Sequence, residues 1–340
     1  MRVGVLTGGG DCPGLNAALR AVVRKGIKDY GMEIVGIKDG WKGLLEADAI
    51  PLNREIIRGL LVRGGTILGS TPHEVFKGDI STERLVEGYN RLHLDALIVI
   101  GGDETLNAAR KLSDAGLKVV GIPKTIDNDL LGTERTIGFS TALWVATEAI
   151  DRLHTTAESH HRVMIVEVMG RHAGWIATMS GIAGGADLIL IPERPFDIAE
   201  ICEVIKRRHQ TKNFTIVVVA EGAFQRGGKE VVNDEEKDAF GYATLGGVAN
   251  WLKKEIRTRT GFDTRATILG HVQRGGTPTP EDRILATRFG VTAVKMVAEG
   301  WFGVMVALRG DEIITIPLKE AIKDRVVDDD WYSIAETFFD

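Results

Sequence analysis

The chain has 340 residues, enough for one large α/β unit or two closely joined domains. Its hydrophobic content of 44% and charged content of 26% are ordinary for a globular protein, and its net charge of −5 argues against nucleic acid or an anionic membrane as a partner. The two cysteines, Cys12 and Cys202, have no metal-binding spacing, so neither a disulfide framework nor a zinc site is predicted. The first residues lack the apolar core of a signal peptide and no apolar run reaches about 18 residues, so we expect a cytoplasmic protein.

Short β-forming runs alternate with amphipathic segments of helix length along almost the whole chain. Apolar residues keep helical spacing most clearly in residues 15–27 and 143–153. The predicted strands, in chain order, are Val3–Leu6, Ile34–Ile37, Ala96–Ile100, Val119–Ile122, Val163–Val168, Leu188–Ile191, Ile216–Ala220 and Ala266–Leu269. Several are continuously apolar, as is typical of parallel strands covered on both faces. With glycine at the strand exits, this pattern predicts a doubly wound parallel sheet, whose ligands bind beyond the carboxyl ends of the strands.

The first predicted strand leads into a glycine turn, in the segment VGVLTGGGDCPGLNAALRAVV. Gly8–Gly10 permit positive φ angles and let backbone N–H groups approach a phosphate closely, and Pro13 and Gly14 suit the start of a helix. The segment is not a Walker loop, because no Gly-Lys-Ser/Thr follows, and it does not match GxGxxG. By itself it leaves two interpretations open: a phosphate-binding turn, or a turn that only redirects the chain.

A second glycine turn carries two acids, in the segment LDALIVIGGDETLNAARKL. Asp103 and Glu104 follow Gly101 and Gly102 directly at the carboxyl end of a predicted strand. A carboxylate in this place suits Mg²⁺, which takes one or two carboxylates together with phosphate oxygens. The alternative for Asp103 is an acid that caps the following helix.

The segment IPKTIDNDLLG places further polar side chains after a buried strand. Asp127 and Asp129 are two residues apart and Thr125 precedes them, which indicates a catalytic base together with a metal or substrate ligand. Several arginines also stand next to predicted strands, where their guanidinium groups suit a phosphate and where surface ion pairs are the alternative. These arginines are Arg162, Arg171, Arg265 and Arg274.

These motifs together make the chain resemble the 6-phosphofructokinase family along nearly its whole length. The matching blocks, in one order, are GGGDCPGLNA, GGD, PKTIDND, VEVMGRHAGW, AEGA and LGHVQRGGTP. The chain is most similar to the actinobacterial branch, in which pyrophosphate-using and ATP-using members are closely related. The resemblance implies an α/β fold of two doubly wound domains with mainly parallel sheets and the active site in the cleft between them. It implies a phosphoryl-donor domain of residues 1–138 and 273–323, a sugar-phosphate domain of residues 139–272, and a C-terminal extension of residues 324–340 that packs on the second domain.

The resemblance also implies an activity and a role for each matching residue. The enzyme would phosphorylate the 1-hydroxyl of fructose 6-phosphate to give fructose 1,6-bisphosphate in glycolysis, with Asp127 as general base and Asp103 as the Mg²⁺ ligand. The catalytic residues would be Thr125, Asp127, Asp129 and Arg171. The fructose 6-phosphate pocket would contain Thr125, Asp127, Asp129, Arg162, Met169, Gly170, Arg171, Glu221, Arg265, His271 and Arg274. Family arginines matching Arg162 and Arg265 reach the sugar phosphate from a neighbouring subunit, so a homodimer or homotetramer with active sites at subunit interfaces is expected.

The donor site would contain Gly10, Asp103, Glu104 and Lys124. ATP-using members usually have glycine at position 104, whereas pyrophosphate-using members usually have aspartate there and lysine at position 124. A carboxylate at this point obstructs the α-phosphate of a nucleotide by volume and charge, and pyrophosphate has no such group. Glu104 is neither of the usual residues, so pyrophosphate is the predicted donor and ATP the alternative.

Two further positions depart from the family pattern. Many members have an arginine near position 72 that stabilises the transferred phosphoryl group, and here Pro72 and His73 occupy the place. Two expectations follow: Lys77 or Lys124 compensates, or turnover is slow. This leaves open a non-catalytic paralogue that binds sugar phosphate, or a kinase for another sugar phosphate such as sedoheptulose 7-phosphate. A vestigial site for a nucleotide effector is also implied, with weak regulation or none, because His154 and Asp187 differ from the usual residues. Its arginines would be Arg20, Arg24 and Arg54, and the alternative is an ordinary charge network at a subunit interface.

Overall fold

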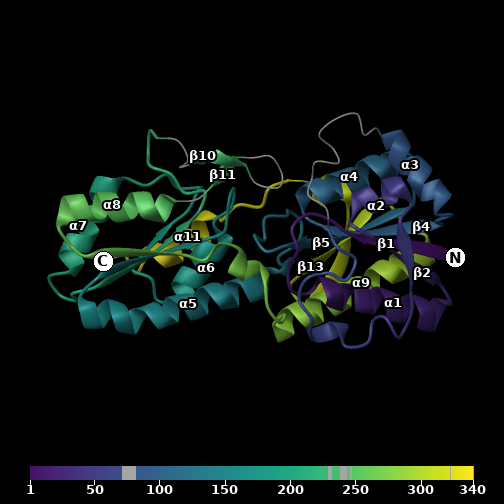
Figure 1. Cartoon of the computed structure of the whole chain (residues 1–340), viewed down its shortest axis with the longest axis horizontal. Helices are drawn as coiled ribbons and strands as arrows, with labels where there is room; N and C mark the ends of the chain where they lie inside the picture. The colour runs from purple at the N-terminus through teal and green to yellow at the C-terminus, as the bar shows by residue number, and fades with distance from the viewer. Residues whose placement is uncertain (71–81, 229–231, 238–242, 246, 322, 340) are drawn as a thin grey trace. The chain divides into compact units, whose positions relative to one another are not determined.

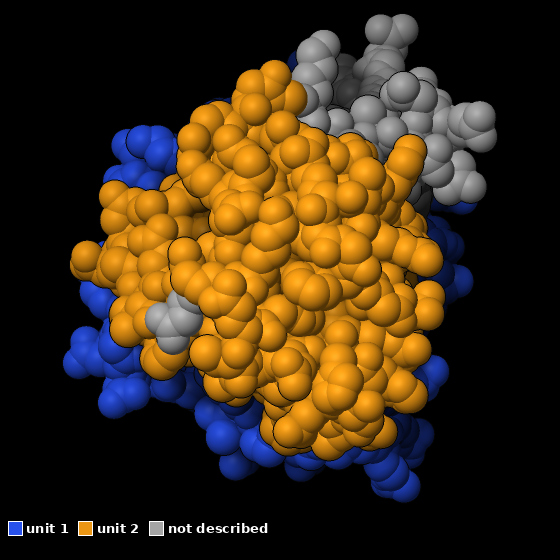
Figure 2. All heavy atoms as spheres, turned by 90° about the vertical axis from the view of Figure 1, so that its left-hand side faces the viewer, with its two compact units in different colours: residues 1–126, 130–141, 274–323 blue, residues 127–129, 142–273, 324–340 orange. Residues whose placement is uncertain are grey.

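The computed structural model describes residues 1–70, 82–228, 232–237, 243–245, 247–321 and 323–339 of the chain (Figure 1). Its internal contacts divide the chain into two compact units, which Figure 2 shows in different colours. Unit 1 comprises residues 1–126, 130–141 and 274–323, and unit 2 comprises residues 127–129, 142–273 and 324–340. Neither unit is therefore one continuous piece of the sequence.

Within the described residues, unit 1 is built on an eight-stranded sheet in the order β14-β13-β5-β4-β1-β2-β3, with β6 paired to β5. The strands are β1 (Arg2–Thr7), β2 (Glu33–Ile37), β3 (Ala49–Leu52), β4 (Ala96–Gly101), β5 (Val119–Thr125), β6 (Ile137–Gly138), β13 (Val304–Arg309) and β14 (Glu312–Pro317). The strands from β13 to β2 pair in parallel, whereas β3 and β14 pair antiparallel at the two edges. Because β1, β4 and β5 are covered on both faces, the central residues of these strands are apolar, and polar residues in β1 and β5 stand only at the strand ends.

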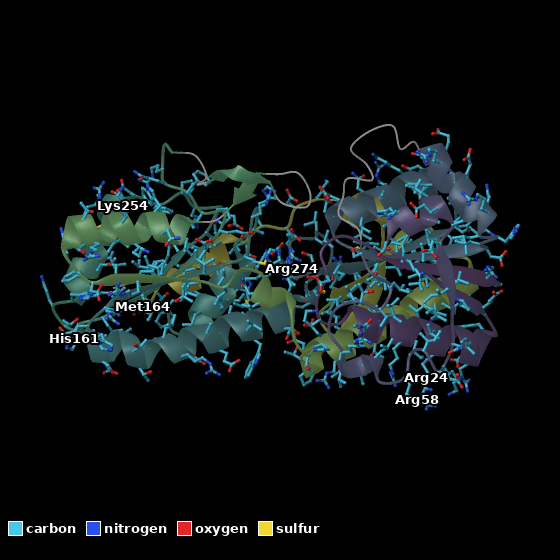
Figure 3. The ribbon with its side chains drawn as sticks, viewed as in Figure 1. Arg24, Arg58, His161, Met164, Lys254 and Arg274 are labelled. Carbon is cyan, nitrogen blue, oxygen red and sulfur yellow. The ribbon has the colours of Figure 1, made fainter. Side chains whose placement is uncertain are left out.

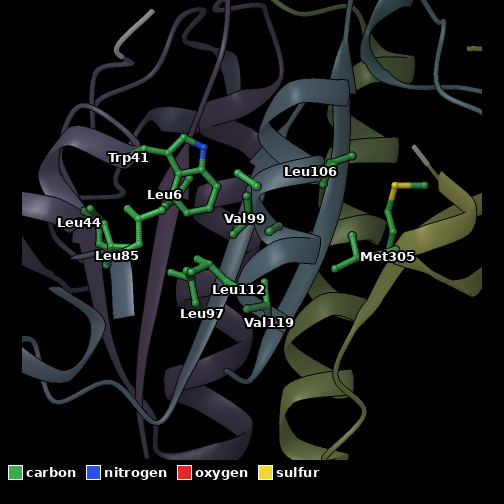
Figure 4. Packing of buried hydrophobic residues seen from close by; sticks show 14 of the residues in the cluster. Leu6, Trp41, Leu44, Leu85, Leu97, Val99, Leu106, Leu112, Val119 and Met305 are labelled. Atoms are coloured by element: carbon green, nitrogen blue, oxygen red, sulfur yellow. The ribbon is translucent and has the colours of Figure 1, made fainter. Parts of the chain in front are cut away.

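Helices cover both faces of this sheet. The long helices α1 (Leu15–Tyr30) and α9 (Pro280–Glu299) pack together on one face (Figure 1). The other face is covered by α2 (Trp41–Glu46), α3 (Thr82–Arg91), α4 (Asp103–Asp114) and α10 (Leu318–Ala321). Leu97 and Val99 of β4 meet Trp41, Leu106 and Leu112 in this second layer (Figure 4). A short 3-10 helix, η1 (Leu60–Val62), lies beside α1.

Unit 2 repeats the architecture on a smaller scale. Its four-stranded sheet has the order β12-β7-β9-β8 and is parallel throughout. The strands are β7 (Val163–Val168), β8 (Leu188–Leu190), β9 (Thr215–Ala220) and β12 (Thr264–Ile268). Helices α7 (Ile198–Arg208) and α8 (Val248–Thr260) cover one face, and α6 (Trp175–Ala183) covers the other, with α5 (Phe139–His160) running alongside (Figure 1). The remaining elements are the antiparallel pair β10 (Val232–Lys237) and β11 (Ala243–Leu245), the 3-10 helix η3 (Gly270–Arg274) and α11 (Asp329–Glu336).

The C-terminal residues pack on α6 through aromatic side chains. Trp175 Nε1 donates a hydrogen bond to the Arg325 carbonyl at 2.9 Å, and the Arg325 guanidinium lies 4.1 Å from the centre of the Trp175 ring. Tyr332 of α11 donates to the Ile189 carbonyl at 2.9 Å. These contacts fix residues 324–339 to unit 2.

The predicted fold class is confirmed: the protein is α/β with mainly parallel sheets. All eight predicted strands are present, and β7 has the predicted bounds. The strands that were not predicted include β3 and β14, which lie at sheet edges where the apolar pattern is weaker. Across the described part of the chain, no helix has both the length and the apolar character needed to cross a membrane.

Candidate active site

The two glycine turns lie side by side because β1 and β4 are neighbours in the sheet. Gly8 N donates to the Ile100 carbonyl at 2.9 Å. Thr105 is 5% exposed and packs against both turns, since a β-carbon on Gly8 would lie 2.6 Å from Thr105 Cγ2 and one on Gly101 would overlap the same side chain. Only glycine fits at these two positions, and Thr105 therefore joins the turns. The sequence interpretation did not single out Thr105.

Three helices have N-termini that are capped by carboxylates distant in the sequence. Asp282 accepts hydrogen bonds from Gly138 N and Thr141 N at the start of α5, both at 2.8 Å, and burial raises the pKa of its carboxyl to about 6. Glu193 accepts from Gly174 N at the start of α6, and Glu167 from Ala249 N at the start of α8, both at 2.9 Å.

The helices that follow the two glycine turns begin differently. Helices α1 and α4 have Gly14 and Gly102 at their N-caps, which leaves their first N–H groups without a cap from that residue. Asp103 is the first residue of α4, and the cap position belongs to Gly102. The interpretation of Asp103 as the N-cap of this helix is therefore wrong, and Asp103 and Glu104 both belong to the first turn of α4.

Two cationic side chains lie on the first glycine turn. Lys124, near the end of β5, is 3% exposed, and its Nζ donates to the Gly10 carbonyl at 2.5 Å. Arg274 Nη1 donates to the Asp11 carbonyl at 3.4 Å. All of these residues belong to unit 1, so the contacts lie within one compact body. The turn thus combines glycine backbone, an uncapped helix start and two positive charges, which suits an anion.

The loop of residues 63–70 is tied to the same turn. Asn16 is fully buried; its Nδ2 donates to the Gly64 carbonyl at 3.0 Å and its Oδ1 accepts from Ile67 N at 3.0 Å. The Ser70 hydroxyl donates to the Gly9 carbonyl. Asn16 and Ser70 thus shape the turn, although sequence reasoning did not assign them a role. Pro72, His73 and Lys77 lie outside the described residues.

A second group of the predicted residues comes together in unit 2. The pKa of Glu221 is raised to about 7, first by burial and then by the negative charge of Asp127, while Arg171 acts in the opposite direction. Glu221 follows β9 and Arg171 follows β7, and Glu221 N donates to the Val168 carbonyl at 2.9 Å. Two carboxylates and a guanidinium that are distant in the sequence therefore influence one another electrostatically.

The segment after β5 has an unusual backbone. Asn128 is buried and has a φ of 54°, in the left-handed region that residues other than glycine seldom adopt. Arg325 N donates to the Asp129 carbonyl at 2.7 Å, which holds this strained segment. Thr136 Oγ1 donates to the Thr125 carbonyl at 2.6 Å and fixes the end of β5.

Met169, Gly170 and η3 adjoin the unit 2 group. Gly170 has a φ of 141°, and its carbonyl accepts from Gly222 N at 3.1 Å. Gln273 is fully buried and its Oε1 accepts from Met169 N at 3.3 Å. This hydrogen bond ties η3, which contains the exposed His271, to the end of β7.

Arg162 and Arg265 do not join this group within the chain. Both lie at the amino ends of their strands β7 and β12, whereas Arg171 and Glu221 lie beyond the carboxyl ends of β7 and β9. Their guanidinium groups share Asp263, at 2.7 Å and 3.2 Å, and the hydrogen bond from Arg162 lowers the pKa of this carboxyl. Asp263 was not singled out from the sequence.

Two of the residues that bear on the predicted effector site, His154 and Asp187, have partners within the chain. Asp187 forms a buried ion pair with Arg208 and accepts from Ile216 N at 2.8 Å. His154 Nε2 lies 2.6 Å from the Gly184 carbonyl. Arg20 and Arg24 lie on α1, where Arg24 is exposed (Figure 3), and Arg54 follows β3.

A resident metal centre built wholly from side chains is not found, since the described residues contain no cluster of three or more histidine, cysteine or carboxylate ligands. Asp103 nevertheless suits a Mg²⁺ ion, which needs only one or two protein carboxylates when phosphate and water complete its shell. Cys12 and Cys202 are both buried, and burial raises the pKa of the Cys12 thiol to about 12.

Comparison with known proteins identifies this arrangement. The family model for phosphofructokinase matches residues 2–297. The chain belongs to the phosphofructokinase family. The resemblance inferred from the sequence is thus confirmed, including the mixture of donor types among actinobacterial relatives.

Relatives of both donor types have similar sequence identity to this chain. The chain is 57% identical over 340 residues to the pyrophosphate–fructose 6-phosphate 1-phosphotransferase of Amycolatopsis methanolica, with 100% of both chains covered. It is 53% identical to ATP-dependent 6-phosphofructokinase 3 of Streptomyces coelicolor, with 99% of both covered. Among solved structures, the phosphofructokinase of Pichia pastoris in the T-state matches with a TM-score of 0.83 and 34% identity, over 99% of this chain and 36% of that longer one.

Proposed function

We propose that the chain is a phosphotransferase that moves a phosphoryl group from pyrophosphate to the 1-hydroxyl of fructose 6-phosphate. The observation that carries the choice of donor is the pair Asp103 and Glu104 in the first turn of α4, directly at the second glycine turn. The three relatives at 57%, 55% and 54% identity whose names specify pyrophosphate support the same choice.

In the proposed reaction, predicted site residues of each unit have a role. Asp127 accepts the proton of the 1-hydroxyl, the freed oxygen bonds to the terminal phosphorus, and the bond from that phosphorus to the bridging oxygen breaks to release phosphate. Thr125 and Asp129 hold the reacting groups, because they flank Asp127 in one short segment. Gly10 and Lys124 bind the donor at the first glycine turn. Mg²⁺ held by Asp103 would neutralise phosphate oxygens when bound.

We assign the binding of fructose 6-phosphate to the residues around Arg171 and Glu221 in unit 2. Arg171 supplies a guanidinium whose positive charge lowers the pKa of Glu221, against the larger effects of burial and of Asp127, which raise it. Met169, Gly170 and His271 adjoin this group through the hydrogen bond between Met169 N and Gln273. A carboxyl beside a guanidinium can bind sugar hydroxyls and phosphate together.

The donor preference follows from the side chain of Glu104. A nucleotide presses its α-phosphate against the turn, so a carboxylate there repels it by charge and obstructs it by volume. Pyrophosphate has no α-phosphate, so the carboxylate of Glu104 does not weaken its binding. An ATP-dependent activity is the second candidate, because five relatives at 51–53% identity have names that specify ATP and because the longer glutamate side chain can turn away from the nucleotide.

Initial rates with fructose 6-phosphate and Mg²⁺ test this proposal. We expect kcat/KM with pyrophosphate to exceed that with ATP by at least about tenfold, which is roughly 1.4 kcal/mol of transition-state stabilisation. A preference for ATP would overturn the donor assignment. Absence of turnover with either donor would favour another sugar-phosphate acceptor or a binding protein without catalysis.

We further propose that Arg162 and Arg265 serve the sugar-phosphate site of a neighbouring subunit in a homodimer or homotetramer. Their position at the amino ends of β7 and β12 supports this, because Arg171 and Glu221 lie at the other end of the same sheet. Measurement of the mass in solution, with and without Arg265→Ala, tests the assembly. A cytoplasmic location is part of the proposal, since multiply charged phosphates do not cross membranes unaided.

Glu221→Gln is expected to change how stability depends on pH. Because the folded-state pKa of Glu221, about 7, lies above its unfolded value of 4.5, this group costs stability progressively as the pH rises from about 4.5 to 7. The wild type should therefore lose roughly 2 kcal/mol relative to the glutamine variant between pH 5 and pH 7.5. Urea unfolding of both proteins across this range measures the difference. Parallel pH profiles would show that Glu221 does not carry the raised pKa.

A further inference from the structure

We propose that Arg325, in the C-terminal segment, is a positioning residue that holds the carboxylate of Asp127 in its reactive place. The inference rests on the proposed role of Asp127 as general base. It adds that a side chain 197 residues beyond Asn128 in the sequence fixes the backbone that carries this base. Arg325 acts through that backbone, so its removal should affect the chemical step more than substrate binding.

The first argument is that the segment of the base belongs to unit 2. Residues 127–129 are grouped with unit 2, although Ile126 and Leu130 on either side of them belong to unit 1. In the middle of the segment, Asn128 has a φ of 54°, which residues other than glycine keep only when the surrounding structure holds them there. Contacts within unit 2 must therefore fix these three residues.

Arg325 supplies two such contacts. Its backbone N donates to the Asp129 carbonyl at 2.7 Å, and its Nη1 donates to the Asn128 carbonyl at 3.4 Å. Beside them, Leu131 N donates to the Lys323 carbonyl at 2.9 Å. The C-terminal segment thus runs along the backbone that directly follows the base and is hydrogen-bonded to it at three points.

Arg325 is in turn anchored on a buried part of unit 2. Its guanidinium lies 4.1 Å from the centre of the Trp175 ring, and its carbonyl accepts a hydrogen bond from Trp175 Nε1 at 2.9 Å. Trp175 is 1% exposed and is the first residue of α6. Because the ring cannot move without disturbing the core, the guanidinium on it has a fixed position.

The same anchor adjoins the residues assigned to the sugar phosphate. Helix α6 comes shortly after the loop that carries Arg171. Glu193 accepts from Gly174 N at the start of α6 and from Val327 N in the C-terminal segment, both at 2.9 Å. Since Arg325 also holds residues 127–129, the C-terminal segment sets where the base stands relative to the sugar-binding residues.

Arg325→Ala is expected to lower kcat about 10- to 100-fold, because misplacing a reacting group by about 1 Å can cost about a hundredfold in rate. KM for either substrate should change less than about threefold. Initial rates with fructose 6-phosphate, Mg²⁺ and the donor that wild type prefers measure both quantities. Arg325→Lys keeps a cation beside Trp175, so it should restore part of kcat, and it also serves if the alanine variant does not fold.

Arg194→Ala is the matched control. Arg194 also holds the C-terminal residues to unit 2, since its guanidinium lies 4.6 Å from the centre of the Tyr332 ring and 2.7 Å from the Asp329 carboxylate. In the described part of the chain, these side-chain contacts are with α11 and not with residues 127–129. Both alanine variants should lower the melting temperature, but only Arg325→Ala should lower kcat.

The double variant of Asp127→Asn and Arg325→Ala separates positioning from a general loss of structure. If Arg325 acts through the base, adding Arg325→Ala to Asp127→Asn should lower kcat further by less than about twofold. A further loss of about tenfold would overturn the inference, as would a normal kcat in Arg325→Ala alone. A normal kcat in Asp127→Asn would instead overturn the assignment of the base, and this inference with it.

The titration of Glu221 supplies a test that needs no turnover. The negative charge of Asp127 raises the pKa of Glu221, so displacement of Asp127 in Arg325→Ala should lower that pKa. Loss of a nearby positive charge alone would raise it, so the direction identifies the displacement. Carbon NMR of labelled glutamate side chains in wild type and in Arg325→Ala measures this change, and an unchanged or raised pKa would overturn the inference.

Discussion

Asp127→Asn is expected to lower kcat by about a thousandfold, within the range that general bases contribute. Asparagine has the same size and keeps one acceptor oxygen, but it cannot take the proton of the attacking hydroxyl. Binding of both substrates should change little, so kcat and kcat/KM should fall together. Initial rates at saturating pyrophosphate and fructose 6-phosphate, with titrations of each substrate as controls, measure this effect.

The same variant offers a readout that does not depend on turnover. The negative charge of Asp127 helps to raise the pKa of Glu221, so its removal should lower that pKa. Carbon NMR of labelled glutamate side chains follows this titration directly, with Glu221→Gln to assign the signal. A variant with nearly normal kcat would show that another group is the base, even if the pKa of Glu221 moved as expected.

Glu104→Gly is expected to raise kcat/KM with ATP about 10- to 100-fold relative to pyrophosphate, the equivalent of roughly 1.4–2.8 kcal/mol. Glycine removes both the charge and the volume that stand at the second turn, so the α-phosphate of a nucleotide can approach the backbone. Since glycine in a helix costs about 1 kcal/mol, the melting temperature of the variant should be measured first. Initial rates with each donor at fixed fructose 6-phosphate then give the ratio.

Glu104→Gln separates the effect of the charge of this side chain from the effect of its volume. It keeps the volume of the side chain and removes the charge, so an electrostatic filter predicts that much of the effect seen with glycine appears with glutamine as well. A purely steric filter predicts that the glutamine variant behaves like wild type. If glycine leaves the donor ratio unchanged, Glu104 does not select the donor, and the preference resides elsewhere in the site.

Local sequence determined the building blocks of this protein. Mainly apolar runs indicated β1, β4, β7 and β9, because strands buried on both faces need apolar residues at most positions, although the buried Glu167 stands within β7. Glycines at strand exits indicated the two turns, because positive φ and close backbone approach exclude larger residues. The edge strand β14 escaped prediction, because half-buried positions impose a weaker pattern.

Tertiary structure alone decided which distant residues meet. Thr105 lies between the two glycine turns, Asp282 caps α5 from 141 residues away, and Arg162 and Arg265 share Asp263. No local pattern encodes such pairs, since each depends on how separate strands and helices pack. The raised pKa of Glu221 and the position of Arg274 on the Gly10 turn arise in the same way, because burial and neighbouring charges exist only once the chain has folded.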